Sequence, residues 1–256
     1  MPHQSQSNYL RLSVTEPGQP EIFLSLQGEG ISSGKPSIFV RLSQCNLHCV
    51  WCDTPYTWNF AGTDFEHIDD TPDNRVKYDR ARETLDLSEE DVFHRIVALN
   101  CPRVIFTGGE PMLQQRPLAT LGRLLKDEIP NCYIEIETNG TITPLPETAS
   151  VIDQFNVSPK LAHSGNTIDI RRKPDTLKFY GADSRANFKF VIQQREDMEE
   201  VNDLVALAGM PPERVYLMPE GTTPAAIMSK APWMADLCIL YGYNFTDRLH
   251  IHLYGD

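Results

Sequence analysis

Three cysteines, Cys45, Cys49 and Cys52, stand close together directly after an apolar run. With three and two residues between them, their thiolates can surround one corner of a [4Fe-4S] cluster and leave the fourth iron without a protein ligand. Such an iron can chelate the amino and carboxylate groups of S-adenosylmethionine (SAM). Zinc is the rival metal, but structural zinc takes four ligands, usually in two separated pairs, and a fourth from His48 would come from the same tight turn. The spacing therefore predicts an iron-sulfur site, and the non-enzymatic alternative is a zinc-dependent interaction module.

Short apolar runs bounded by turn residues predict the strands that position this loop. They span residues 37–42, 103–107, 132–137, 154–157, 187–192 and 215–218. Helix-type patterns lie between several of them, at 118–126 and at 88–100, where Ser88 can cap the first turn and Val92, Ile96 and Val97 share a face. Alternating strands and helices imply an α/β fold with parallel strands, as in a complete or partial TIM-like barrel. Functional sites then lie at the carboxyl ends of the strands.

The composition indicates a protein that acts on a small molecule. The 256 residues are 41% hydrophobic, which is enough for one full-sized core. Thirty-five acidic against 23 basic residues give a net charge of -12, which opposes binding to nucleic acid or to an anionic membrane. No apolar stretch approaches the roughly 20 residues that cross a bilayer, and the first residues lack the pattern of a signal peptide. We expect a cytoplasmic protein.

The chain is expected to form a single domain over residues 19–256, preceded by a loosely held arm at 1–18. Residues 60–86 are charged and lack apolar periodicity, so they predict a solvated insertion after the cysteine loop. In the cytoplasm thiols stay reduced, so Cys101, Cys132 and Cys238, which are scattered among apolar neighbours, are expected to be buried as small apolar side chains.

A second motif, Thr107-Gly108-Gly109-Glu110-Pro111, follows the predicted strand at 103–107. Glycines there let the backbone approach a ligand closely, and the Glu110 carboxylate can accept a hydrogen bond from the ammonium group of SAM. The three-cysteine loop and this Gly-Gly-Glu-Pro motif together resemble the radical SAM superfamily. The resemblance implies that a reduced cluster cleaves SAM to a 5'-deoxyadenosyl radical and that the protein positions and protects this radical.

Further strings narrow the resemblance. The series LQGEG at 26–30, FVRL at 39–42 and CNLHCVWCDT at 45–54 is similar to 7-carboxy-7-deazaguanine synthases, as are IETNGT at 136–141 and VSPK at 157–160. The family resemblance implies that 6-carboxy-5,6,7,8-tetrahydropterin rearranges to 7-carboxy-7-deazaguanine with loss of ammonia, in 7-deazapurine biosynthesis of the queuosine type. It also implies a shortened α/β barrel, a homodimer, and an electron donor such as flavodoxin.

Matching positions carry the roles that the resemblance implies. Substrate contacts are implied for Leu26, Gln27, Gly28, Glu29, Arg41 and Thr107, with Arg41 meeting the substrate carboxylate. SAM contacts are implied for Trp51, Asp53, Gly109, Glu110, Ser158, Pro159 and Lys160. Thr54 matches the magnesium ligand of the family, and its hydroxyl could join substrate oxygens around Mg²⁺, a hard cation.

Two points stay open. A glycyl-radical enzyme activase has the same cysteine spacing and is the alternative enzyme, although the LQGEG string and Asp53-Thr54 favour the pterin enzyme. Near the chain end, His250 and His252 alternate on a strand-like segment, where they either contact substrate or make structural hydrogen bonds.

Overall fold

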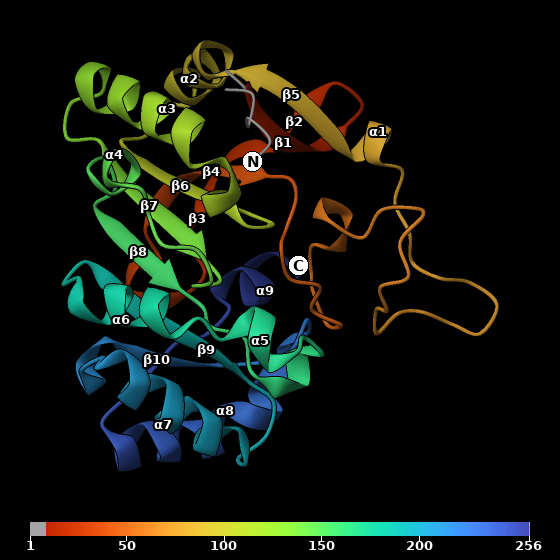
Figure 1. Ribbon diagram of the computed structural model, residues 1–256, viewed down its shortest axis with the longest axis vertical. Coiled ribbons are helices and arrows are strands. Elements are labelled where there is room, and N and C mark those ends of the chain that lie inside the picture. Colours follow the sequence, from red (N-terminus) through yellow and green to blue (C-terminus); the bar gives the residue numbers. More distant parts are fainter. Residues whose placement is uncertain (1–8, 256) are drawn as a thin grey trace.

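The computed structural model describes residues 9–255 and is built on an eleven-stranded sheet (Figure 1). Seven neighbouring strands are parallel: β4 (Pro36–Leu42), β6 (Arg103–Gly108), β7 (Tyr133–Thr138), β8 (Gln154–Val157), β9 (Ala186–Ile192), β10 (Val215–Pro219) and β11 (Asn244–Phe245). Antiparallel strands β1 (Tyr9–Glu16), β2 (Gln19–Pro20), β3 (Ile22–Leu26) and β5 (Thr84–Ser88) extend it beyond β4. Within the described residues the order runs from β11 to β2 without closing, which makes this the predicted partial barrel.

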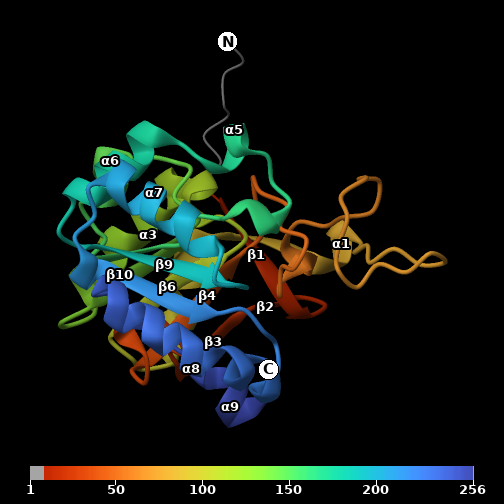
Figure 2. The same ribbon diagram turned by 90° about the horizontal axis from the view of Figure 1, so that it is seen from below.

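Helices follow most of the parallel strands and cover the outer face of the sheet (Figure 2). The helices of the described residues are α1 (Arg80–Glu83), α2 (Glu89–Ala98), α3 (Gln115–Glu128), α4 (Pro146–Ala149), α5 (Ile168–Arg171), α6 (Pro174–Ala182), α7 (Asp197–Ala208), α8 (Pro224–Tyr241) and α9 (Leu249–Tyr254). Two of them lie outside this layer: α1 precedes β5 beside the projecting loops, and α9 contacts Gly28 at the mouth of the barrel. Ser88 caps α2 as predicted, because its Oγ accepts from the Asp91 N–H at 3.1 Å. Val92 and Ile96 are buried, but Val97 is 44% exposed, so its predicted place on the same face is wrong.

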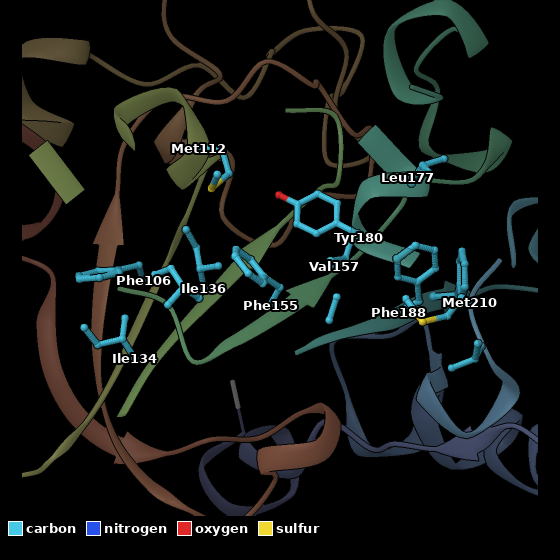
Figure 3. Packing of buried hydrophobic residues seen from close by; sticks show 14 of the residues in the cluster. Phe106, Met112, Ile134, Ile136, Phe155, Val157, Leu177, Tyr180, Phe188 and Met210 are labelled. Carbon is cyan, nitrogen blue, oxygen red and sulfur yellow. The ribbon is translucent and has the colours of Figure 1, made fainter. Parts of the chain in front are cut away.

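The core lies between the sheet and its helices. Phe106, Ile136, Phe155 and Val157 point from neighbouring strands toward the helical layer, and Tyr180 of α6 packs edge-on against Phe155 (Figure 3). Because side chains alternate along a strand, the intervening residues face the inside of the barrel. The core therefore sets which side chains line the lumen.

The predicted arm at 1–18 is wrong for the residues that the structure describes. Tyr9–Glu16 forms β1, which pairs with β4 and, over residues 9–13, with β5. Leu10 and Leu12 are fully buried, so this strand belongs to the core. Residues 1–8 lie outside the described part of the chain.

The predicted insertion at 60–86 ends earlier than expected, because Arg80–Glu83 is helix α1 and Thr84 begins β5. The preceding loops project from the barrel in both views (Figure 1, Figure 2). Cys132 and Cys238 are buried as predicted, whereas Cys101 is half-buried at the surface. Across residues 9–255, no helix has the length and apolar character needed to cross a membrane.

Candidate active site at the mouth of the barrel

Polar side chains line the lumen near the carboxyl ends of the parallel strands. Arg41 of β4 is in register with Thr107 of β6, and Glu137 of β7 with Asn156 of β8, which is itself in register with Asn187 of β9. Thr107 donates to Glu137 at 2.8 Å and so joins the two pairs. We call these five residues the lumenal ring. It offers a guanidinium, a carboxylate and the Asn187 amide to a small polar ligand, whereas the Asn156 amide is bonded to Gln154 and Glu135.

The end of β3 closes over one side of the lumenal ring. Gln27 donates to Glu137 at 3.0 Å and accepts from the Glu29 N–H at 3.1 Å. Glu29 is ion-paired with Lys189 and with Arg248, whose Nε lies 3.1 Å from Glu29 Oε1. Burial by itself raises the pKa of Glu29, but the two positive charges outweigh burial and hold the pKa well below its usual value. Glu29 is therefore a carboxylate fixed in place by its own chain.

A small cavity lies beside the lumenal ring. The residues that line it include Glu29, Glu137, Asn187, Lys189 and Tyr216. Asn187 is only 9% exposed, and its amide has no hydrogen-bond partner among the described residues. A water molecule, or a polar group at the edge of a ligand, can supply the missing partner.

The cysteine loop follows β4 and is held at the same mouth. The Leu47 N–H donates to Cys45 Sγ at 3.4 Å, and Asn166 Nδ2 donates to Cys49 Sγ at 3.4 Å. Burial raises the pKa of Cys49 to about 11, so bound iron is what would hold it as a thiolate. N–H groups aimed at sulfur, three cysteines and no disulfide among them fit an iron-sulfur cluster. Cys45, Cys49 and Cys52 would hold it.

The loops after residue 60 pack onto the cysteine loop rather than being solvated throughout. His67 is 6% exposed, and its Nε2 lies 2.8 Å from the Cys52 carbonyl oxygen. The ring of Phe65 stacks on His48, with 3.4 Å between ring centroids. These contacts limit the motion of the cysteine loop.

The Gly-Gly-Glu-Pro motif brings the end of β6 against the cysteine loop. Gly108 has φ +121°, and a Cβ there would lie 2.0 Å from the Leu42 carbonyl oxygen. A Cβ on Gly109 would lie 2.0 Å from the Gln44 carbonyl oxygen. Only glycine permits this approach at either position. The motif therefore sets the distance between the second strand and the cysteines.

The Glu110 carboxylate, which is predicted to contact the SAM ammonium, is bonded within the chain. This carboxylate is 0% exposed and accepts from the backbone N–H groups of Met112 (3.0 Å) and Asn139 (2.7 Å) and from the Thr138 hydroxyl (2.8 Å). Burial raises its pKa, while these hydrogen bonds favour the charged form. Because its carboxylate is already bonded inside the chain, we assign Glu110 the role of joining the ends of β6 and β7.

The other residues predicted to contact SAM surround the cysteine loop. Lys160 donates to Ser158 at 3.0 Å, and its ammonium lies 5.8 Å from the centre of the Trp51 ring. Trp51 Nε1 donates to the His163 carbonyl oxygen at 3.2 Å. Asp53 is ion-paired with Arg248, and Pro159 is buried between Ser158 and Lys160. The structure thus places these residues near one another, on the cluster side of the mouth.

Thr54 directly precedes a short turn, η2 (Pro55–Thr57), and Arg41 lies near Tyr56 of that turn. The Thr54 hydroxyl lies 3.6 Å from Cys52 Sγ, so it is next to the cluster ligands. Arg41 is bound by Glu21: its Nε donates to Glu21 Oε1 at 2.6 Å. Burial opposes the charge of Arg41, but Glu21 outweighs burial and raises the pKa of the guanidinium. Leu26 is the last residue of β3, which pairs with β4, and it is half-buried.

The end of the chain reaches the site as helix α9, not as the predicted strand-like segment. The Leu249 N–H donates to the Gly28 carbonyl oxygen at 2.9 Å. A Cβ on Gly28 would lie 2.0 Å from His250 Nδ1, so Gly28 leaves room for that imidazole. His252 Nε2 lies 3.2 Å from Asp247 Oδ1. Of the two alternatives, a substrate contact or a structural hydrogen bond, His252 therefore makes the structural hydrogen bond. Asp256 lies outside the described residues.

Several residues of the site received no role from the sequence, although Glu137 and Asn139 lie in the IETNGT string: Glu21, Tyr56, Glu137, Asn139, Asn156, Asn187, Lys189 and Arg248. Each stands in an ordinary strand or turn, and only long-range pairing brings it to the mouth. For Glu137 a signal existed, since a charged residue in the apolar run 133–138 has to face the lumen or carry a partner.

Comparison with known proteins agrees with this geometry. The family model described as "Radical SAM superfamily" matches residues 40–220, which include all three clustered cysteines and β6 to β10. The partial barrel with this cysteine loop is therefore a member of the radical SAM superfamily.

Relatives narrow the assignment. The "7-carboxy-7-deazaguanine synthase" of Pyrobaculum aerophilum is 35% identical over 92% of this chain and 94% of its own, and that of Halobacterium salinarum is 33% identical over 92% and 90%. The crystal structure of QueE from Escherichia coli matches with a TM-score of 0.64 and 25% identity over 94% of this chain and 95% of its own. The chain belongs to the 7-carboxy-7-deazaguanine synthase family.

Proposed function

We propose that this chain converts 6-carboxy-5,6,7,8-tetrahydropterin to 7-carboxy-7-deazaguanine with loss of ammonia, as a step of 7-deazapurine biosynthesis such as that of queuosine. One observation carries the proposal: the end of β7 reaches both halves of the site. Glu137 belongs to the lumenal ring, and two residues later Asn139 Nδ2 lies 2.9 Å from Asn46 Oδ1 and 4.0 Å from Cys45 Sγ. A pterin in the ring therefore lies next to the cysteine loop.

The residues divide into two groups by what they can bind. A reduced [4Fe-4S] cluster with SAM supplies a carbon-centred radical that removes a hydrogen atom from the substrate. Trp51, Asp53, Ser158, Pro159 and Lys160, with the backbone of Gly109, are proposed to hold SAM. Leu26, Gln27, Gly28, Glu29, Arg41 and Thr107 are proposed to hold the pterin, together with Glu137.

Several parts of the proposal go beyond the family assignment. Thr54 is proposed to bind Mg²⁺ together with oxygens of the substrate, because a lone hydroxyl is a poor site for a hard cation. An electron donor such as flavodoxin is proposed to reduce the cluster, and the active form is proposed to be a homodimer. The cytoplasmic location stays a prediction.

Product analysis tests the proposed function. The anaerobically reconstituted protein is incubated with SAM, a reductant, Mg²⁺ and the carboxypterin, and the products are analysed by mass spectrometry. We expect 7-carboxy-7-deazaguanine and one ammonia per product, and neither from the Cys49→Ala protein. SAM cleavage that leaves the pterin intact would instead favour the glycyl-radical activase.

A further inference from the structure

Two residues outside the recognised motifs, Glu21 and Tyr56, form a hydrogen-bonded group with the Arg41 side chain. We propose that Glu21 and Tyr56 form a support that fixes the Arg41 guanidinium with its two terminal nitrogens free for the carboxylate of the substrate. Glu21 and Tyr56 are then positioning residues that determine affinity for a carboxylated pterin. This inference rests on the proposed function and assigns the residues behind its carboxylate site.

The contacts define the support. Arg41 Nε donates to Glu21 Oε1 at 2.6 Å, and the Arg41 backbone N–H donates to the Glu21 carbonyl oxygen at 3.0 Å. The Tyr56 hydroxyl lies 3.0 Å from Glu21 Oε2 and 3.2 Å from Oε1, so it donates to that carboxylate. The three side chains thus form one connected group.

The support leaves the binding edge of Arg41 available. A guanidinium carries five N–H bonds, and Glu21 takes the one on Nε. Among the described residues, the other four have no hydrogen-bond partner within the chain, although the side chain is only 19% exposed. Two parallel N–H bonds from the terminal nitrogens match the two oxygens of a carboxylate. A buried cation with an open edge therefore fits a carboxylated ligand.

Holding the guanidinium in advance increases affinity because a flexible arginine otherwise loses rotamer freedom when the ligand binds. The negative charge of Glu21 acts in the opposite direction, since it partly cancels the positive charge that attracts the substrate. Geometry decides between these effects: Glu21 binds Nε and leaves the end of the guanidinium open. Tyr56 also links this group to Thr54, because η2 begins directly after Thr54.

The test compares two ligands on the reconstituted holoenzyme. Dissociation constants and KM are measured for 6-carboxytetrahydropterin, and dissociation constants for tetrahydropterin without the carboxylate. We expect Glu21→Gln to weaken binding of the carboxylated ligand about tenfold, to change binding of the other ligand less than twofold, and to affect KM more than kcat. Asp183→Asn is the matched control, because it removes a carboxylate 2.7 Å from Arg185 in the loop before β9, at the opposite end of the strands.

A double variant tests whether Glu21 affects ligand binding through Arg41 or independently of it. Because Glu21 acts through Arg41, Glu21→Gln should weaken binding less than twofold further in an Arg41→Lys background. If Glu21→Gln does not assemble the cluster, Tyr56→Phe carries the same comparison, with an expected loss of about threefold.

Three results would overturn the proposal. Glu21→Gln could weaken binding of both ligands equally, or it could tighten binding of the carboxylated ligand. In the double variant, the fold-losses in affinity from Glu21→Gln and Arg41→Lys could multiply in full, as they do for independent residues. The proposed function fails separately, when the unaltered protein binds the carboxypterin but forms no product.

Discussion

Replacing Glu110 by glutamine separates the two roles considered for this residue. The substitution keeps the shape of the side chain and one acceptor oxygen but replaces the other oxygen by an NH₂ group. That group would face a donor, since the Glu110 carboxylate accepts from Met112, Thr138 and Asn139 in a fully buried position. One buried N–H therefore loses its acceptor.

The structure allows an estimate of the cost. Leaving a buried donor without a partner costs about 1–3 kcal/mol, and a hydrogen bond to a charged group contributes about 1.5–3 kcal/mol. Part of this loss is offset because the neutral amide is easier to bury than the carboxylate, whose pKa is raised by burial. We expect a net destabilisation of about 2 kcal/mol, which lowers Tm by about 4–8 °C for a chain of this size.

The assay is thermal unfolding of Glu110→Gln beside Glu147→Gln, an exposed control whose carboxylate lies 4.0 Å from Arg116. The control should change the free energy of unfolding by less than about 0.5 kcal/mol. SAM affinity is measured on the reconstituted proteins. An unchanged Tm together with a large loss of SAM affinity would refute our assignment and restore the carboxylate as a SAM ligand.

Three further substitutions test the site. Cys49→Ala should abolish SAM cleavage because two thiolates cannot retain the cluster, whereas Cys101→Ala should not; iron and sulfide analysis of both proteins checks this. Arg41→Lys should raise the KM for the carboxypterin and leave SAM binding nearly normal, since an ammonium cannot pair bidentately with a carboxylate; an unchanged KM would place Arg41 away from the substrate. Thr54→Ala should slow turnover and blunt its dependence on Mg²⁺ while the cluster absorbance stays intact. Identical magnesium titrations of both proteins after chelation would make Thr54 a turn residue only.

Local strings were sufficient to predict the chemistry and the class of fold. The cysteine loop and the Gly-Gly-Glu-Pro motif are contiguous, and the six predicted strands all exist, because buried parallel strands are short apolar runs. Strand β1 was missed although Leu10, Leu12 and Val14 alternate with less apolar residues, which is the pattern of a half-buried strand. The predicted end of the insertion was wrong because β5, which lies within residues 60–88, pairs with the strand β1 that was not predicted.

Partners within the site could not be predicted in the same way. Glu21 and Arg41 meet because β3 and β4 are antiparallel neighbours, and Glu29 meets Lys189 only because the barrel curves. No periodicity encodes which strands become neighbours across a lumen. The role of Glu110 also depended on burial, because the same motif fits a ligand contact and a structural carboxylate.

The most direct test of the account is the yield of product when SAM is limiting. In the proposed rearrangement the product radical would take back the hydrogen atom that the SAM-derived radical removed from the pterin, so SAM could re-form and one SAM molecule would serve many turnovers. When the concentration of SAM is well below that of the pterin substrate, we predict many molecules of 7-carboxy-7-deazaguanine per molecule of SAM and nearly complete recovery of SAM. One or fewer products per SAM, with 5'-deoxyadenosine accumulating in equal amount, would contradict the account.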